Sequence, residues 1–186
     1  MKLADTRLGP ILEAVKSRAD SRSAGRTDST FWTHVNRISA GPQAVETLRS
    51  PTLSVIAECK RRSPSAGTLA KEADLSQRAM QYAEDGAAAI SILTEQDHFG
   101  GDPADLRAVE HVGLPRLRKD FLLDEAMVLE SVAMGADAVL LLAVCLPDPL
   151  LGELLEVARA LGLGVLVEVH DESELERALA CEPDCV

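Results

Sequence analysis

The sequence predicts an α/β fold built around a parallel sheet, and two observations support that prediction. From Pro51 onward, a short apolar run, a polar or glycine-containing loop and an amphipathic stretch follow one another five times. The apolar runs are nearly continuous, which is typical of strands that helices bury on both faces. Such alternation favours either a barrel or a doubly wound sheet. No GxGxxG motif follows the first apolar run, and its absence disfavours a doubly wound sheet that binds a dinucleotide. We expect a partial (β/α)8 TIM barrel with an N-terminal helical extension.

Residues 1–50 are the expected helical extension, and residues 51–186 are the expected partial barrel. The first part carries eight basic and five acidic residues, whereas the second carries 11 and 25, so the net charge changes sign at the boundary. Phe31–Ile38 is one helical stretch of the extension, and an earlier one has four apolar residues on a single face. We expect these helices to cover one end of the barrel. The four apolar residues are Leu8, Ile11, Leu12 and Val15.

Strands and helices are expected to alternate strictly in the second part. The strands are Leu53–Cys59, Ala88–Leu93, Arg116–Lys119, Ala138–Ala143 and Gly164–Val169. The helices that follow them are Leu75–Asp85, Pro103–Glu110, Glu125–Met134, Leu150–Leu161 and Ser173–Ala180. Two of these helices are followed by Gly-Ala, at Gly86 and Gly135, where glycine suits a helix end before the next strand.

The number of repeats falls short of a closed barrel. Eight units typically need about 250 residues. The chain supplies five complete units, and Asp184-Cys185-Val186 has the pattern of the start of a sixth strand. We therefore expect a chain shortened by roughly 70 residues at the usual unit length. Such an open sheet has unpaired edges, which predicts poor solubility or aggregation.

Composition excludes several classes of protein. The net charge of −11 and an aromatic content of 3% disfavour nucleic-acid binding. The longest apolar run, Ala138 to Leu146, has nine residues and is too short to span a membrane. The N-terminus has no apolar signal region, so a cytoplasmic protein is expected. The cysteines suit core packing better than a metal site, because no second ligand cluster accompanies them; they are Cys59, Cys145, Cys181 and Cys185.

Charged residues stand where three of the expected strands end. In parallel barrels the active site forms at the carboxyl ends of the strands. Glu58 and Lys60 follow one another at alternate positions and so face one side, Lys119 ends the third strand, and Glu168 lies near the end of the fifth. Two lysines and two glutamates at a partly desolvated mouth suit proton transfer, since burial and neighbouring charge tune acids and bases. Two structural ion pairs are the alternative, and spacing alone does not decide between them.

Further residues near these strand ends suggest an anionic small substrate. Six of the 11 basic residues of the acidic second part cluster at two strand ends: Lys60, Arg61, Arg62, Arg116, Arg118 and Lys119. The loop Arg62–Gly67 offers hydroxyls to an anion, or it is only a turn. The segment His98–Gly101 is expected to be a flexible loop in which Phe99 provides an apolar wall. His170 is expected to point away from Glu168 and to be structural.

Five strings closely resemble the indole-3-glycerol phosphate synthase family of tryptophan biosynthesis. They are IAECKRRSPSAG (Ile56–Gly67), AISILTEQDHFGGD (Ala89–Asp102), LPRLRKDFLLD (Leu114–Asp124), GADAVLLLAVCL (Gly135–Leu146) and LVEVHDESEL (Leu166–Leu175). The resemblance implies a (β/α)8 barrel with an N-terminal helical extension. It also implies a carboxy-lyase that closes the ring of 1-(2-carboxyphenylamino)-1-deoxyribulose 5-phosphate with loss of carbon dioxide and water, and that needs neither cofactor nor metal.

The resemblance also assigns roles residue by residue. Lys119 matches the general acid of ring closure, and Glu168 matches the general base of the later dehydration. Lys60 matches a lysine that binds substrate anions and has also been given an acid role. Glu58 matches a catalytic-site carboxylate beside it. Ser63 and Phe99 match ligand-contacting loop positions, and Leu140 matches an apolar wall at the fourth strand.

Two alternatives stay open beside this interpretation. One is another phosphate-binding TIM-barrel enzyme, although such enzymes lack the combination of Glu-x-Lys, Lys-Asp-Phe and Glu-Val-His at three strand ends. The other is an inactive half-barrel fragment that acts as a binding or assembly module. The expected partner is a phosphorylated, carboxylated small molecule, with neither nucleic acid nor membrane. Fusion or association with other tryptophan-pathway enzymes is also left open.

Overall fold

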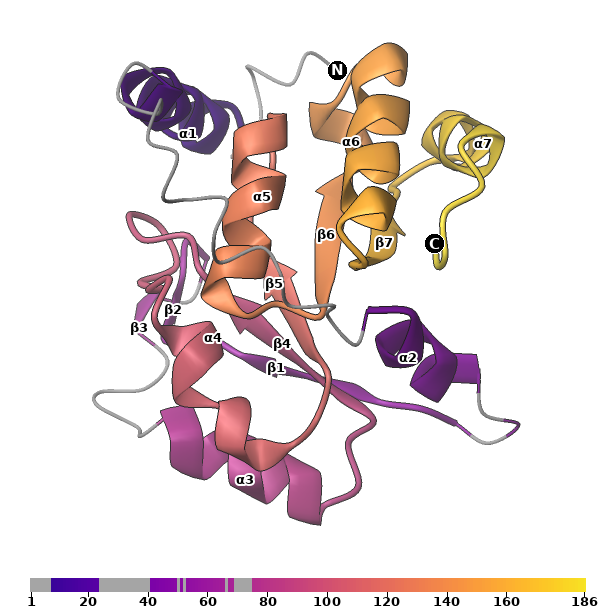
Figure 1. Ribbon diagram of the computed structural model, residues 1–186. Coiled ribbons are helices and arrows are strands. Elements are labelled where there is room, and N and C mark those ends of the chain that lie inside the picture. Colours follow the sequence, from indigo (N-terminus) through magenta and orange to yellow (C-terminus); the bar gives the residue numbers. More distant parts are fainter. Residues whose placement is uncertain (1–7, 24–40, 50, 52, 66, 69–74) are drawn as a thin grey trace.

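A five-stranded parallel sheet organises the computed structural model, which describes residues 8–23, 41–49, 51, 53–65, 67–68 and 75–186. The strand order is β1-β4-β5-β6-β7, so each strand lies beside the next one along the chain, apart from a small hairpin after β1 (Figure 1). The strands are β1 (Ile56–Cys59), β4 (Ala89–Leu93), β5 (Arg116–Lys119), β6 (Ala138–Leu142) and β7 (Gly164–Glu168), and the hairpin strands are β2 (Arg62–Ser63) and β3 (Gly67–Thr68).

The helices connect these strands in the order that the sequence predicts. They are α3 (Leu75–Glu84), α4 (Asp105–Ala108), α5 (Glu125–Met134), α6 (Asp148–Ala160) and α7 (Glu172–Ala180), with short 3-10 turns at η4 (Glu110–Val112) and η5 (Ala143–Cys145). The expected helix Pro103–Glu110 is instead split, because the backbone leaves the helical region at Val109 (φ −102°, ψ 8°). The expected strand from Leu53 begins only at Ile56, since its partner β4 begins at Ala89.

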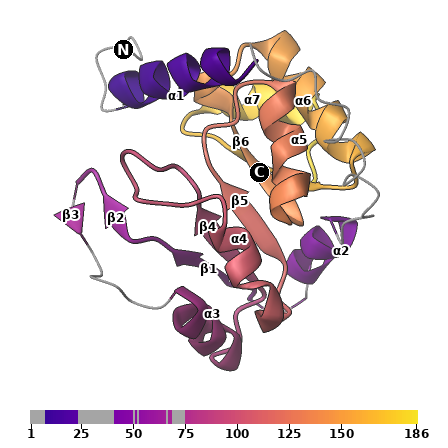
Figure 2. The same cartoon turned by 60° about the vertical axis from the view of Figure 1, so that its left-hand side comes forward.

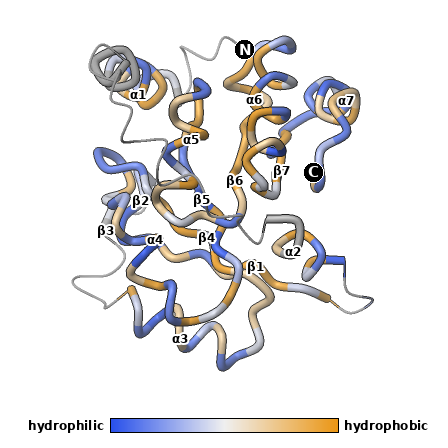
Figure 3. The backbone as a smooth tube through the Cα atoms, in the orientation of Figure 1, coloured by the Kyte–Doolittle hydropathy of each residue, from blue (hydrophilic) through white to orange (hydrophobic). Residues whose placement is uncertain are grey.

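The parallel register separates two faces of the sheet. Residues paired across neighbouring parallel strands point to the same side. Arg118, Val139 and Val165 occupy one register row and face the helices, as the contacts of Arg118 with α5 show. Leu117, Ala138 and Leu166 lie on the opposite, concave face, where they line a cavity. Hydrophobic residues run along β4, β6 and β7 in the centre of the molecule (Figure 3).

Local signals fix the ends of the helices. Asp124 caps α5 by accepting a hydrogen bond from the Met127 amide at 2.8 Å. Gly135 ends the same helix in the left-handed conformation (φ 86°), which an L-residue adopts only at a cost, and its N–H bonds back to α5. Gly86 has a similar φ of 89° after α3. The two glycine positions predicted from the sequence are therefore confirmed.

The described N-terminal helices lie at both ends of the sheet (Figure 2), and the second of them was not predicted from the sequence. In α1 (Leu8–Ser23), Ile11, Leu12 and Val15 are buried in the main hydrophobic cluster, as their shared face predicts. Lys16 of α1 is near enough to Cys145, just after β6, for its charge to act on the thiol. By contrast, residues of α2 (Gly41–Glu46) and η3 (Thr47–Arg49) line the cavity at the amino ends of the strands. Figure 2 shows α1 and α2 on different sides of the molecule. The stretch expected at Phe31–Ile38 lies outside the described residues.

The start of a sixth strand is present, as predicted. Cys185 forms a parallel bridge with Leu166 of β7. Its carbonyl accepts from the Val167 amide at 2.9 Å, and its amide donates to the Val165 carbonyl at 3.2 Å. The sheet therefore continues in parallel register beyond β7. No helix in the described part of the chain is long and apolar enough to cross a membrane.

Candidate active site

The four predicted charged residues form two ion pairs at the carboxyl ends of the strands. Lys60 Nζ lies 2.5 Å from Glu58 Oε1, and Lys119 Nζ lies 3.1 Å from Glu168 Oε2. The side chains of Lys119 and Glu168 are 30% and 34% exposed, so both are accessible to a ligand. Both pairs are partly exposed, and ion pairs at a protein surface contribute only about 0–1 kcal/mol to stability. A contribution to stability therefore does not by itself explain why either pair is present.

The Lys119–Glu168 pair spans β6. Lys119 ends β5 and Glu168 ends β7, so the strands that carry them are two inter-strand spacings apart, roughly 10 Å. Their side chains meet because both point to the concave side of a curved sheet. Leu140 of β6 lies on the same face between them and is buried. An ammonium group and a carboxylate therefore lie over an apolar floor, to which the predicted wall residue Leu140 belongs.

The prediction that six basic residues cluster at the strand ends is wrong. Of the six, only Lys60 and Lys119 face the concave side. Arg116 and Arg118 alternate with Lys119 along β5 and so point toward the helices. Arg116 Nε lies 3.0 Å from Asp137 Oδ2, and Arg118 is almost fully buried.

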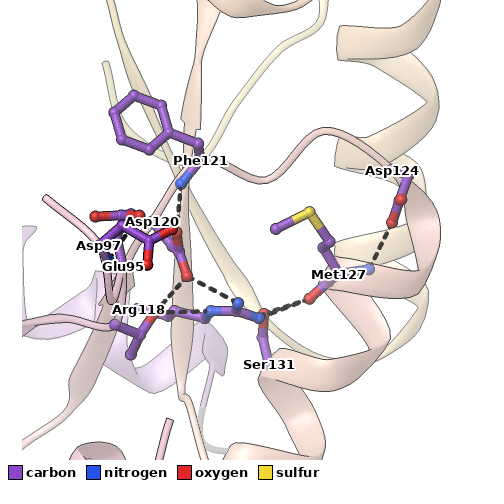
Figure 4. A network of polar contacts seen from close by, with 9 residues as sticks. Glu95, Asp97, Arg118, Asp120, Phe121, Asp124, Met127 and Ser131 are labelled. Carbon is purple, nitrogen blue, oxygen red and sulfur yellow. Dashed lines mark hydrogen bonds and ion pairs between the residues drawn. The ribbon is translucent and has the colours of Figure 1, made fainter. Parts of the chain in front are cut away.

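Arg118 is the centre of a buried polar network that joins β5, the residue after β4, and α5 (Figure 4). It donates to Thr94 Oγ1 at 3.1 Å, Asp120 Oδ2 at 2.9 Å, the Met127 carbonyl at 2.8 Å and Ser131 Oγ at 3.0 Å. Asp120 also accepts from Thr94 Oγ1 at 2.6 Å. A buried guanidinium is tolerated only when its donors are satisfied, as they are here.

The loop after β4 is pinned rather than flexible, contrary to expectation. The buried Glu95 carboxylate accepts from the backbone amides of Asp97, His98 and Phe99 at 3.2, 2.7 and 3.2 Å. From the other side, Arg62 donates to the His98 carbonyl at 3.1 Å and also to the Asp97 carbonyl. Arg62 was predicted to face an anion, but its guanidinium group binds the backbone of this loop instead.

Phe99 and Ser63 occupy the two loops that adjoin these strand ends. The Phe99 ring lies 6.4 Å from the Phe121 ring, centroid to centroid, and both belong to segments that follow strands. Such a pair gives the loop an aromatic surface. Ser63, in the β2–β3 hairpin, is nearly buried, and its Oγ lies 3.3 Å from Ser65 Oγ. Arg61 anchors the preceding residues on Asp105, and this hydrogen bond raises the pKa of the Arg61 guanidinium.

His170 contacts Glu168, although strand alternation predicts that the two side chains point to opposite sides. Its Nε2 lies 3.3 Å from Glu168 Oε1, and its Nδ1 lies 3.3 Å from Glu174 Oε2. Strand alternation does not apply at His170, because β7 ends at Glu168. The missed signal is the helix-start pattern Asp171-x-x-Glu174, which places Glu174 at the first turn of α7 and lets it reach back.

Two of the cysteines are too buried to be candidate nucleophiles. Burial raises the pKa of the Cys59 thiol to about 11 and that of the Cys145 thiol to about 12, so both stay protonated near neutral pH. All four cysteines of the chain are free. Across the described ranges, no group of three or more His, Cys, Asp or Glu side chains is arranged to hold a metal ion.

Comparison with known proteins gives the family. A family model described as indole-3-glycerol phosphate synthase matches residues 11–186. A protein of that name from Parafrankia sp. (strain EAN1pec) is 47% identical over 173 residues, covering 92% of this chain and 65% of the relative. Another, from Nocardioides sp. (strain ATCC BAA-499 / JS614), is 55% identical over 139 residues, covering 74% and 54%. The chain therefore spans between about half and two thirds of these relatives' length.

Solved structures agree on the fold. The carboxyl transferase domain of Rhizobium etli pyruvate carboxylase superposes with a TM-score of 0.53 at 15% identity, over 77% of this chain and 28% of that one. A mandelate oxidase mutant gives 0.53 at 14% identity, over 77% of this chain and 57% of that one. At such identity the likeness shows the fold alone. The sequence match to the family, by contrast, covers nearly the whole chain, which belongs to the indole-3-glycerol phosphate synthase family.

Proposed function

We propose that the protein converts 1-(2-carboxyphenylamino)-1-deoxyribulose 5-phosphate to indole-3-glycerol phosphate, as a carboxy-lyase of tryptophan biosynthesis. The observation that carries the proposal is the Lys119–Glu168 pair above Leu140, at the end of the sheet where barrels of this kind bind their substrates. The family match supports it and does not favour either alternative, another phosphate-binding barrel enzyme or an inactive assembly fragment. We also propose that residues 1–50 are an extension of a barrel that begins at residue 51.

Lys119 supplies the proton of ring closure. As the aromatic carbon that bears the carboxylate attacks the ketone carbon, the carbonyl oxygen gains negative charge and takes a proton from the ammonium group. The carbon–carbon bond to the carboxylate then breaks, carbon dioxide leaves, and its electron pair restores the aromatic ring. Lys119 is suited to this role because it is accessible and is held in place by Glu168 at 3.1 Å.

Glu168 removes the proton of the dehydration. The hydroxyl formed in ring closure takes a proton from the Lys60 ammonium group and leaves as water, while Glu168 takes a proton from the neighbouring carbon so that the new double bond forms. Lys60, paired with Glu58, attracts the substrate anions. The electrostatic attraction rests on two lysines rather than on the six basic residues first expected.

Phe99, Ser63 and Leu140 complete the proposed substrate site. The Phe99–Phe121 pair offers an aromatic face to the anthranilate ring, and Leu140 supplies the apolar floor beneath it. Ser63 lies in the loop directly after Lys60, where its hydroxyl can meet an anion. We also propose a cytoplasmic location, which four unpaired cysteines support.

Turnover followed by indole fluorescence tests the proposal. The assay uses the 186-residue chain and the same chain joined after Val186 to the part of the Parafrankia relative that lies beyond the match. We expect the joined protein to form product and its Lys119→Met variant to lose activity. Lys16→Met is the matched control, because Lys16 is an exposed lysine paired only weakly with Glu13 at 4.0 Å. A well-folded joined protein without turnover would contradict the proposed function.

A further inference from the structure

The Glu168 carboxylate is held from two sides. Lys119 Nζ donates to Oε2 at 3.1 Å, while His170 Nε2 faces Oε1 at 3.3 Å. The lysine and the imidazole thus take one oxygen each. The two contacts come from different elements, since Lys119 ends β5 and His170 follows β7.

His170 is itself fixed by Glu174. The Glu174 carboxylate accepts from the His170 backbone amide at 2.8 Å and faces the ring nitrogen Nδ1 at 3.3 Å. Glu174 is buried, and its own amide donates to the Asp171 cap of α7 at 2.8 Å. The start of α7 therefore fixes the position of both the backbone and the ring of His170. A row of four side chains results: Lys119, Glu168, His170 and Glu174.

This row matters when Lys119 acts. To protonate the substrate, the ammonium group must turn from Glu168 toward the substrate oxygen, and Glu168 then loses the contact at Oε2. The contact at Oε1 does not depend on that movement, because His170 is anchored by α7. A carboxylate that keeps one polar contact stays oriented for the later proton removal, and orientation of this kind contributes to rate rather than to substrate affinity.

We propose that His170 is a positioning residue for Glu168, which it orients through Nε2 while Glu174 fixes the ring. The inference rests on the proposed function, in which Glu168 is the base of the dehydration. It assigns to His170 no direct contact with the substrate. It also distinguishes the two ion pairs of the site, because the Glu58 carboxylate contacts Lys60 and none of its described contacts is with a histidine.

Nuclear magnetic resonance of the histidine rings tests the contact on the 186-residue chain without any need for turnover. In a chain labelled with 15N-histidine, Glu168→Gln should move the ring-nitrogen signals of His170, whereas Lys119→Met should move them much less. The signals of His111, whose ring faces Ser76 Oγ at 3.0 Å, serve as the internal control and should stay in place in both variants. Unmoved His170 signals in Glu168→Gln would overturn the proposal, whatever the enzyme does.

Kinetics of the joined protein test the role. We expect His170→Ala to lower kcat about three- to tenfold with KM unchanged, the equivalent of one lost polar contact. His170→Asn, which keeps a donor, and added imidazole, which can enter because the side chain is half exposed, should each restore part of the rate. His111→Ala is the matched control and should keep the full rate. An unchanged kcat in His170→Ala would refute the positioning role, whereas an inactive parent protein would refute the proposed function instead.

Discussion

Replacement of Arg118 by methionine should destabilise the fold strongly, because this buried arginine joins three elements. Methionine fills much of the same volume with a flexible apolar chain. It removes the hydrogen bonds to Thr94, Asp120, Met127 and Ser131. The buried Asp120 carboxylate keeps its bonds to Thr94 Oγ1 and to the Phe121 amide but loses its counter-charge. Removal of one partner from a buried pair costs about 3–5 kcal/mol.

That cost is a large part of the stability of a domain, which is typically about 5–15 kcal/mol. Urea unfolding followed by far-ultraviolet circular dichroism measures the free energy of unfolding. Arg49→Met is the matched control, since Arg49 pairs with Glu46 at 3.7 Å on the surface, and a loss below about 1 kcal/mol is expected there. The double variant Arg118→Met/Asp120→Asn should recover part of the loss, because it also removes the unpaired charge. A loss in Arg118→Met no larger than in the control would refute the role given to the network.

The pinned loop and the buried thiols give two further predictions. Gly101→Ala should lower the melting temperature, measured by calorimetry, because the new Cβ would lie 2.3 Å from the Leu93 carbonyl oxygen. Gly113→Ala is the control: this position has open space around it, so the variant measures only the cost of a positive φ. An equal effect in both would contradict the steric reason. Cys59 and Cys145, whose pKa values are raised to about 11 and 12, should resist thiol reagents at pH 8 in the folded chain. Since the unfolded chain releases these protons near pH 9 and the folded chain retains them, the free energy of unfolding should fall as pH rises from about 9 to 11, and a flat profile there would argue against buried thiols.

The order and the type of the elements were predictable from the sequence. The runs at Arg116–Lys119 and Glu125–Met134 are confirmed to the residue. Nearly continuous apolar strands and glycine after a helix reflect local physics, which a single sequence displays directly. The start of a sixth strand at Cys185 was predictable for the same reason, because it is the next strand in the repeating pattern.

The candidate site was only partly predictable. Lys119 and Glu168 were placed correctly at the mouth of the sheet, because parallel strands bring their carboxyl ends together. Arg116 and Arg118 were misjudged, although their alternation with Lys119 along one strand indicates the opposite face. These arginines were grouped with Lys119 because they are close to it in sequence. Along a strand, however, successive side chains point to opposite faces of the sheet.

Loop geometry was the least predictable part. The segment His98–Gly101 reads as flexible because it is rich in glycine, yet Glu95 and Arg62 fix it from both sides. These contacts join residues up to 36 positions apart, and nothing in the local pattern specifies them. The same holds for His170, whose direction depends on how α7 begins rather than on β7.

Carbon dioxide release, measured against indole formation, tests the assigned roles of Lys119 and Glu168 most directly. The substrate carries 13C in its carboxylate, and the protein is the chain joined to the remaining part of the Parafrankia relative. We expect Lys119→Met to release no carbon dioxide. Glu168→Gln should release it without formation of the fluorescent indole, because ring closure precedes the dehydration that needs the base. Release of carbon dioxide by Lys119→Met at the parent rate, or indole formation by Glu168→Gln at that rate, would contradict the roles assigned to these two residues.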